Sequence, residues 1–178
     1  MMSQAGNPKE MLFVNKLNER RLADVFDRYI EELENHFGAD YLGTHSIHFE
    51  WYPTGSKVKN AKSDGYVLDR DNQWVRNKEI DLVGILWLND YNPNGDTFDE
   101  SYEAYGGKLE FPNFDISFNP ERGSLVVFPT APNFVYTISD VYGGDMTVAK
   151  FTIRTEKPYA YDANKFNHDP TEWKGLTN

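Results

Sequence analysis

Short apolar runs bounded by turn residues constrain the fold of this chain more than any other feature. The runs are IDLVGILWLND at 80–90, YGGKLEFP at 105–112 and GSLVVFPT at 123–130. Each is rich in Val, Ile, Leu, Phe or Trp and is flanked by Gly, Pro, Asn or Asp, as buried strands are. An alternating run, MTVAKFTIR, follows at 146–154. No helical period interrupts 79–154, so the pattern predicts antiparallel strands that close into a sandwich or jelly roll.

A different periodicity precedes the strands. Apolar side chains recur at steps of three and four residues over 15–37, Asn15 is suited to cap the start, and Gly38 is suited to the end. We predict an amphipathic support helix packed outside the sheet. The single domain then divides into an N-terminal segment (1–14) that leads into an edge strand, the helix (15–37), a β core (45–156) and an irregular tail (157–178).

Charge and composition exclude several classes of protein. The formal net charge is −10, from 28 acidic and 18 basic residues, and the chain contains no cysteine. Such a surface repels phosphate backbones and anionic lipid, so we expect neither nucleic acid nor membrane as a partner. Disulfides and thiolate metal sites are impossible. We find no secretory signal and no transmembrane segment, and expect a cytoplasmic or virion protein.

The order of the strand motifs resembles a known family. The segments LWLND, GGKLEFP and NPERGSLVVFPT, followed by an aromatic-Val-x-x-Ile segment that ends in YGG, occur in that order within 47–154. They resemble the iron(II)/2-oxoglutarate-dependent oxygenases of the prolyl 4-hydroxylase-like type, including the short forms carried by bacteriophages. The resemblance implies a mainly β fold, a double-stranded β-helix of roughly eight strands with the long helix outside. It also implies a site with a His-x-Asp motif, a second histidine, and an Arg or Lys for the keto acid.

Three of these four positions are substituted in this chain. The His-x-Asp position reads Lys62-Ser63-Asp64, Tyr136 stands where the second histidine belongs, and Met146 replaces the basic residue. A protonated lysine is no metal ligand, and a thioether cannot pair with a carboxylate. We therefore predict a degenerate active site, a pseudoenzyme that needs neither Fe(II) nor 2-oxoglutarate as a cofactor. An incidental ion pair between Lys62 and Asp64 is left open.

Four further residues are predicted to line the same cavity. The resemblance places Tyr52 at the cavity edge, and strand alternation gives His48 and Glu50 the same face as Tyr52. Lys150 shares a strand face with Met146, but lies roughly 13 Å farther along the strand. It would meet a keto acid only in a shifted pose.

Three functions remain open at this point. The first is an inactive oxygenase-like domain that binds proteins or builds an assembly, such as a phage virion or accessory protein, with virion subunits or itself as partner. The second is an active Fe(II)/2-oxoglutarate-dependent hydroxylase with an atypical metal site. That site would use Asp64 with Tyr136 or with the His48/Glu50 pair, and His45 or His168 would complete it. The third is a sugar- or small-molecule-binding jelly roll with a pocket lined by Tyr52, Trp87 and Tyr136.

Overall fold

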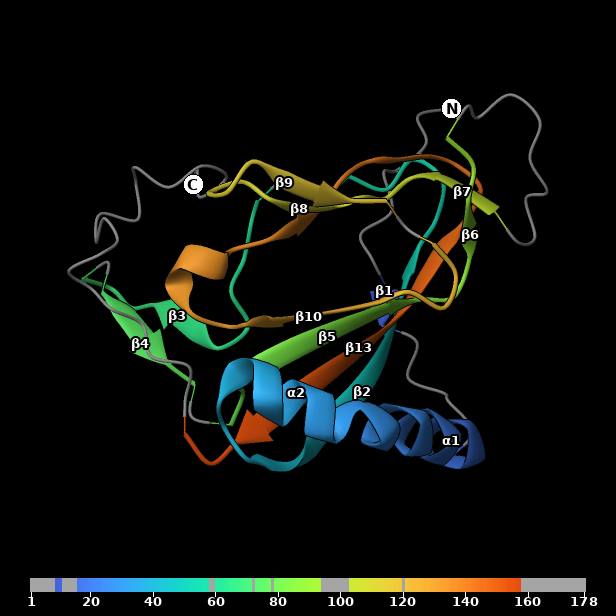
Figure 1. Ribbon diagram of the computed structural model, residues 1–178. Coiled ribbons are helices and arrows are strands. Elements are labelled where there is room, and N and C mark those ends of the chain that lie inside the picture. Colours follow the sequence, from blue (N-terminus) through green and yellow to red (C-terminus); the bar gives the residue numbers. More distant parts are fainter. Residues whose placement is uncertain are drawn as a thin grey trace.

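A computed structural model shows a mainly β protein in layers (Figure 1). It describes residues 9–10, 16–57, 60–71, 73–77, 79–93, 103–119 and 121–157. The helical layer lies against one face of a large sheet, and several small sheets lie over the opposite face (Figure 1). This arrangement is consistent with the predicted jelly roll.

The large sheet has the strand order β1-β2-β13-β5-β10, and every neighbouring pair in it is antiparallel. β13 lies at its centre, between β2 and β5, and carries the alternating run that the sequence predicted. The predicted strand at 45–52 begins earlier than expected. The strands of this sheet are β1 (Lys9–Glu10), β2 (Tyr41–Tyr52), β5 (Leu82–Trp87), β10 (Leu125–Pro129) and β13 (Met146–Thr155).

The opposite layer consists of short strands, which suit its many turns. One small sheet has the order β11-β8-β9, a second has the order β12-β7-β6, and β3 pairs with β4 beside them. A 3-10 turn, η2 (Pro132–Phe134), leads from β10 into β11. The strands are β3 (Tyr66–Leu68), β4 (Trp74–Arg76), β6 (Asp90–Tyr91), β7 (Glu103–Gly106), β8 (Leu109–Phe111), β9 (Ile116–Phe118), β11 (Thr137–Ile138) and β12 (Val141–Gly143).

The predicted single helix over 15–37 is not confirmed as one continuous helix. The structure contains α1 (Lys16–Phe26), a 3-10 turn η1 (Asp27–Tyr29) and α2 (Ile30–Phe37). No glycine or proline, the residues that usually mark a break, lies in this stretch. The predicted end is confirmed, because Gly38 adopts a left-handed φ of 64° and donates its backbone N–H to the Glu34 carbonyl.

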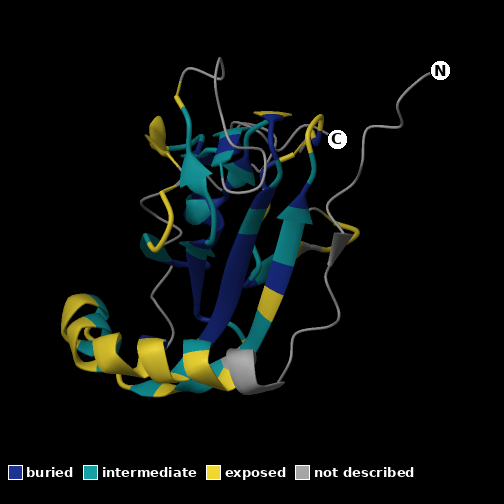
Figure 2. Cartoon of the chain, turned by 90° about the vertical axis from the view of Figure 1, so that its right-hand side faces the viewer, coloured by how far each residue is buried: buried dark blue, intermediate teal, exposed yellow. Residues whose placement is uncertain are grey.

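Alternation along the central strands builds two cores. Figure 2 shows buried residues concentrated in the strands and exposed residues on the helices. Met146, Val148 and Lys150 face the small sheets, whereas Ala149 and Phe151 face the helices. The inner core, between the sheets, comprises Tyr52, Val83, Ile85, Trp87, Ala104, Leu109, Phe111, Phe128, Tyr136, Ile138, Val141, Met146 and Val148. The outer core, under the helices, comprises Phe26, Phe49, Leu82, Ala149, Phe151 and Ile153.

Some predictions fall outside the described residues. These include most of the N-terminal segment, apart from the short edge strand β1, and the tail beyond residue 157. Among the helices that the structure describes, none is long and apolar enough to span a bilayer.

Candidate functional site

The register of β2 against β13 brings five of the predicted site residues onto one face, namely His48, Glu50, Tyr52, Met146 and Lys150. Met146 lies opposite Tyr52, and Lys150 lies opposite His48. Directly paired residues of antiparallel strands have side chains on the same side of the sheet. The predicted cavity-lining residues of these two strands therefore do share the inner face.

A second contact brings the loop before β3 to this face. Lys62 and Tyr136 form an isolated antiparallel bridge, in which each backbone N–H donates to the other's carbonyl at 2.8 and 2.9 Å. Asp64 follows two residues later and points toward the same place. Residues distant in sequence thus converge as the resemblance implied.

Asp64 is the centre of a buried polar network. Its Oδ1 accepts a hydrogen bond from Lys150 Nζ at 2.6 Å, and its Oδ2 accepts one from the Tyr136 hydroxyl at 2.6 Å. Lys150 Nζ also lies 3.8 Å from Glu50 Oε1, and Glu50 Oε2 accepts a hydrogen bond from the Tyr52 hydroxyl. Both carboxylate oxygens of Asp64 therefore have partners within the protein.

The cation in this network is almost completely buried. Lys150 is only 6% exposed, and its ammonium lies 5.9 Å from the centre of the Tyr136 ring. The Lys62 ammonium lies 5.6 Å from the same ring centre, although the Lys62 side chain as a whole is exposed. Two lysines thus approach the place that the resemblance assigns to metal ligands.

Burial and charge shift the pKa values of the network in opposed ways. Burial alone would raise the pKa of Asp64, but the nearby Lys150 and Lys62 outweigh it and hold that pKa below its ordinary value. Burial lowers the pKa of Lys150, against the opposing effect of Asp64 and Glu50. Burial and then Asp64 raise the pKa of Tyr136 well above its ordinary value. The phenol therefore stays protonated and acts as a hydrogen-bond donor.

Met146 lies in the inner core rather than in the polar network. Its side chain is fully buried and packs with Tyr52 and Tyr136 in the apolar cluster. A Cβ added at Gly107 would lie 2.4 Å from the Met146 sulfur, so the thioether fills the space beside that glycine. An apolar residue is well suited to this position.

The histidine-based alternative gains no cluster from the structure. His48 is exposed, and its Nε2 lies 2.8 Å from Ser46 Oγ. Among the described residues, no three His, Cys, Asp or Glu side chains gather as metal ligands would. The side chain of His45 and all of His168 lie outside the described residues.

The three aromatics of the sugar-binding alternative belong to one buried core. Tyr52, Trp87 and Tyr136 are each no more than 3% exposed and all belong to the inner core. They are brought together as expected, but as packed core side chains. Stacking on a ligand would require one of these ring faces to be uncovered.

The pairing of Lys150 with Asp64 was missed by the sequence analysis. The sequence leaves open an incidental ion pair of Asp64 with Lys62, and places Lys150 too far along its strand to meet a keto acid in the usual pose. The usable signal was the alternation of Met146, Val148 and Lys150, which aims a lysine at the face where Asp64 was expected. A lysine on a buried face normally requires an acidic partner.

Comparisons with known proteins agree on the fold. No family model matches the sequence, and no curated protein matches it. One similar solved structure is the viral collagen prolyl hydroxylase of Paramecium bursaria Chlorella virus-1 in complex with 2-oxoglutarate. It superposes with a TM-score of 0.63 and is 18% identical in sequence. The match covers 85% of this chain and 81% of the viral enzyme. A truncated form of the same enzyme gives a TM-score of 0.60 at 13% identity, over 83% and 74%. The chain has the fold of prolyl 4-hydroxylase-like oxygenases.

The residues present do not fit the iron centre that this fold implies. Such a centre needs two imidazoles and one carboxylate on one face of the metal. This chain offers Lys62, Asp64 and Tyr136, and the one carboxylate is already bonded to an ammonium and a phenol. The position that the resemblance assigns to the basic partner of the keto acid holds the apolar Met146. We therefore derive no reaction step through iron.

Proposed function

We propose that this chain is a catalytically inactive relative of the 2-oxoglutarate oxygenases that acts as a protein-binding or structural module. One observation carries the proposal: the Lys150 ammonium lies 2.6 Å from Asp64, the only retained ligand position. A positive charge there repels a divalent cation and also satisfies the carboxylate electrostatically. Lys150 thus does internally what a bound metal would otherwise do.

The direct test is to restore the ligands with and without Lys150. The variant Lys62→His/Tyr136→His supplies two imidazoles beside Asp64, and the variant Lys62→His/Tyr136→His/Lys150→Leu also removes the internal cation. Met146 is kept, because an arginine at this fully buried position would destabilise the inner core. Fe(II) binding is measured anaerobically by calorimetry.

We expect tight Fe(II) binding only in the variant that lacks Lys150. The variant that retains Lys150 is its matched control, since the two have the same ligand set. Equal affinity in both variants would refute the role of Lys150. Fe(II) and 2-oxoglutarate binding by the unaltered protein would instead favour the active hydroxylase with an atypical site.

The most concrete version of this module is a virion or virus-encoded accessory protein. The resemblance to phage forms supports it, and the oxygenase with a TM-score of 0.63 is itself virus-encoded. Its partners are other virion subunits or further copies of this chain. Sedimentation equilibrium over a wide range of protein concentration tests the second choice, and a monomer throughout would exclude it.

A further inference from the structure

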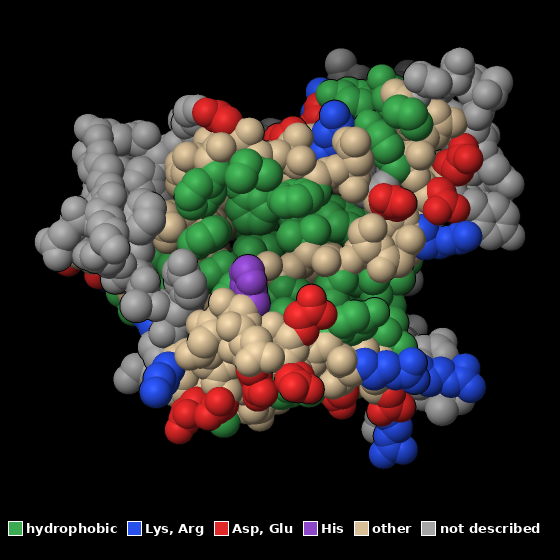
Figure 3. All heavy atoms as spheres, viewed as in Figure 1, with side chains coloured by type: hydrophobic (Ala, Val, Ile, Leu, Met, Phe, Trp, Pro, Cys, Tyr) green, Lys and Arg blue, Asp and Glu red, His purple; other side chains and the backbone are tan. Residues whose placement is uncertain are grey.

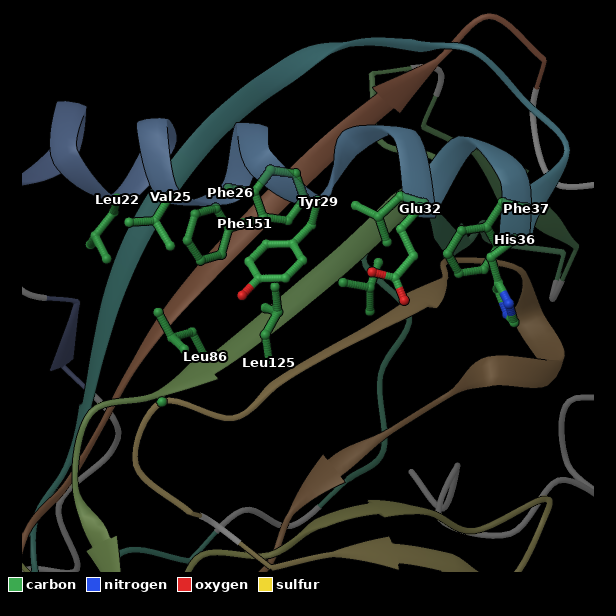
Figure 4. A pocket seen from close by; sticks show the side chains of 13 residues that line it. Leu22, Val25, Phe26, Tyr29, Glu32, His36, Phe37, Leu86, Leu125 and Phe151 are labelled. Atoms are coloured by element: carbon green, nitrogen blue, oxygen red, sulfur yellow. The ribbon is translucent and has the colours of Figure 1, made fainter.

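An apolar groove lies on the outer side of the large sheet, away from the polar network. It is a cavity of about 460 Å³ between the helical layer and strands β5 and β10. Figure 4 shows its side chains extending from Leu22 at one end to His36 and Phe37 at the other. We call it the helix groove; its walls also include Val25, Phe26, Tyr29, Glu32, Leu33, Leu86, Gly123, Leu125, Val127 and Phe151.

The groove exists because the helices cover the sheet unevenly. Phe26 stacks on Phe151 of β13, with ring centres 5.0 Å apart, and also contacts Tyr41 of β2. β10 is the edge strand on the far side of β5, and its Leu125 and Val127 are only half-buried. Figure 3 shows hydrophobic side chains directly above the helical layer and, over a wider area, higher on the same side of the molecule.

The helix side of the groove also leaves apolar surface in water. Val25 is 46% exposed and Tyr29 is 49% exposed, and both line the groove. Removing such side chains from water is favourable, in proportion to the apolar area that is buried. A neighbouring apolar segment would therefore gain by covering them.

We propose that the C-terminal segment, residues 158–178, docks in the helix groove of its own chain. The described chain reaches residue 157 next to the end of α2: the Glu156 N–H donates to the Asp40 carbonyl at 2.8 Å. Asp40 follows Phe37 by three residues, and Phe37 lines one end of the groove. The segment therefore starts beside the place where it would dock.

The segment has the length that this path requires. The helical wall from Leu22 to Phe37 extends about 22 Å, at about 1.5 Å per residue. A flexible chain spans on average roughly 17 Å over the nine residues from Lys157 to Phe166, and roughly 22 Å over the sixteen to Trp173. Both aromatics thus reach the groove without extension of the chain, and the tether raises their effective concentration there.

The segment also has matching chemistry. Its aromatic side chains include Phe166 and Trp173, and each has a lysine as its immediate neighbour in sequence, Lys165 and Lys174. The groove is apolar along its floor, and α2 contributes three glutamates and no lysine or arginine. One of them, Glu32, lines the groove. The segment as a whole carries three acidic residues and two lysines, so its aromatic anchors rather than its charge match the apolar groove.

The absence of cysteine allows a specific test in the full-length chain. The substitution Gly175→Cys provides a single attachment point for a nitroxide spin label two residues after Trp173. Paramagnetic broadening of backbone amide signals then reports which surface the segment approaches. We expect broadening at Val25, Tyr29 and Leu125, and its loss when Phe166 and Trp173 are both replaced by alanine.

A pair of matched surface variants controls for general effects of added charge. Val25→Glu places a carboxylate in the groove and should lower the ratio of docked to undocked segment about tenfold. Val67→Glu makes the same change on β3, where Val67 is 58% exposed, and should leave the broadening unchanged.

Other occupants of the groove would give different results. In a second sample, spin-labelled protein without ¹⁵N is mixed with ¹⁵N-labelled protein that has no cysteine and therefore no spin label. The amide signals of the ¹⁵N-labelled copy should show no broadening. Broadening in this mixture would mean that the segment docks on a second copy, and would overturn the proposal. Broadening at β9, where Ile116 and Phe118 are also exposed, or no localised broadening, would overturn it as well.

Discussion

Replacing Lys150 by methionine removes the buried cation while keeping most of its volume. The Lys150 side chain is 7% exposed and that of Asp64 is 16% exposed, so the change leaves a nearly buried carboxylate without its counter-ion. Removing one partner of a fully buried ion pair costs about 3–5 kcal/mol. Asp64 keeps some solvent and its hydrogen bond from Tyr136, so we expect the free energy of unfolding to fall by about 2–3 kcal/mol.

A double-mutant cycle isolates the interaction between the two charges. Asp64→Asn leaves Lys150 with Glu50 alone, at 3.8 Å, whereas Lys150→Met/Asp64→Asn leaves no charge at either position. Urea unfolding followed by circular dichroism should give a double variant that is more stable than the sum of the single losses by about 1–3 kcal/mol.

A surface lysine serves as the control for this cycle. Lys57 lies 3.8 Å from Asp140 and its side chain is 64% exposed, so Lys57→Met should change the free energy of unfolding by less than about 0.5 kcal/mol. Strictly additive losses for Lys150 and Asp64 would refute the reasoning, because they would mean that the two charges do not stabilise each other.

Three further predictions concern the pH dependence of Asp64 and two other parts of the fold. The lowered pKa of Asp64 means that its contribution to stability is complete above its ordinary value of 3.8 and is lost as pH falls through the lower folded-state value. The difference in unfolding free energy between wild type and Asp64→Asn should therefore shrink below that pH in acid titrations. Gly107→Ala should lower the free energy of unfolding in urea by about 2–4 kcal/mol, because φ is +70° and the new Cβ would meet the Met146 sulfur. Gly123→Ala is the control: φ is +84° there but the new Cβ meets no atom, so the loss should be only about 1 kcal/mol. Phe26→Ala should cost about 3–5 kcal/mol by thermal or urea unfolding, because this fully buried ring joins α1 to the sheet; a loss below about 1 kcal/mol would mean that the helical layer is not packed as described.

The fold was largely predictable from local patterns. The runs that became β5, β8, β10 and β13 are short, apolar and bounded by turn residues, and such patterns depend little on distant contacts. The break at η1 was not predictable in this way, because the residues at 27–29 carry no helix-breaking signal. Tertiary packing decides such details.

The candidate site was predictable as a set of positions but not as a network. Lys62, Asp64 and Tyr136 converge because their elements are fixed by the strand order, which the motif order already indicated. The choice of Lys150 as the partner of Asp64 depends on the register of β13 against its neighbours. Alternation in the sequence shows which face of a strand a side chain occupies, but it does not show which residue of the neighbouring strand lies opposite.

We propose that an internal cation, Lys150, takes the place of a metal ion at Asp64. The most direct measurement is an anaerobic titration of the unaltered protein with Fe(II), alone and with 2-oxoglutarate, followed by calorimetry and visible absorption, with Asp64→Ala as the reference. We predict that the unaltered protein gives no more binding heat or absorption change than this reference. Saturable, micromolar binding that Asp64→Ala abolishes would contradict the claim and identify an oxygenase with an unusual set of ligands.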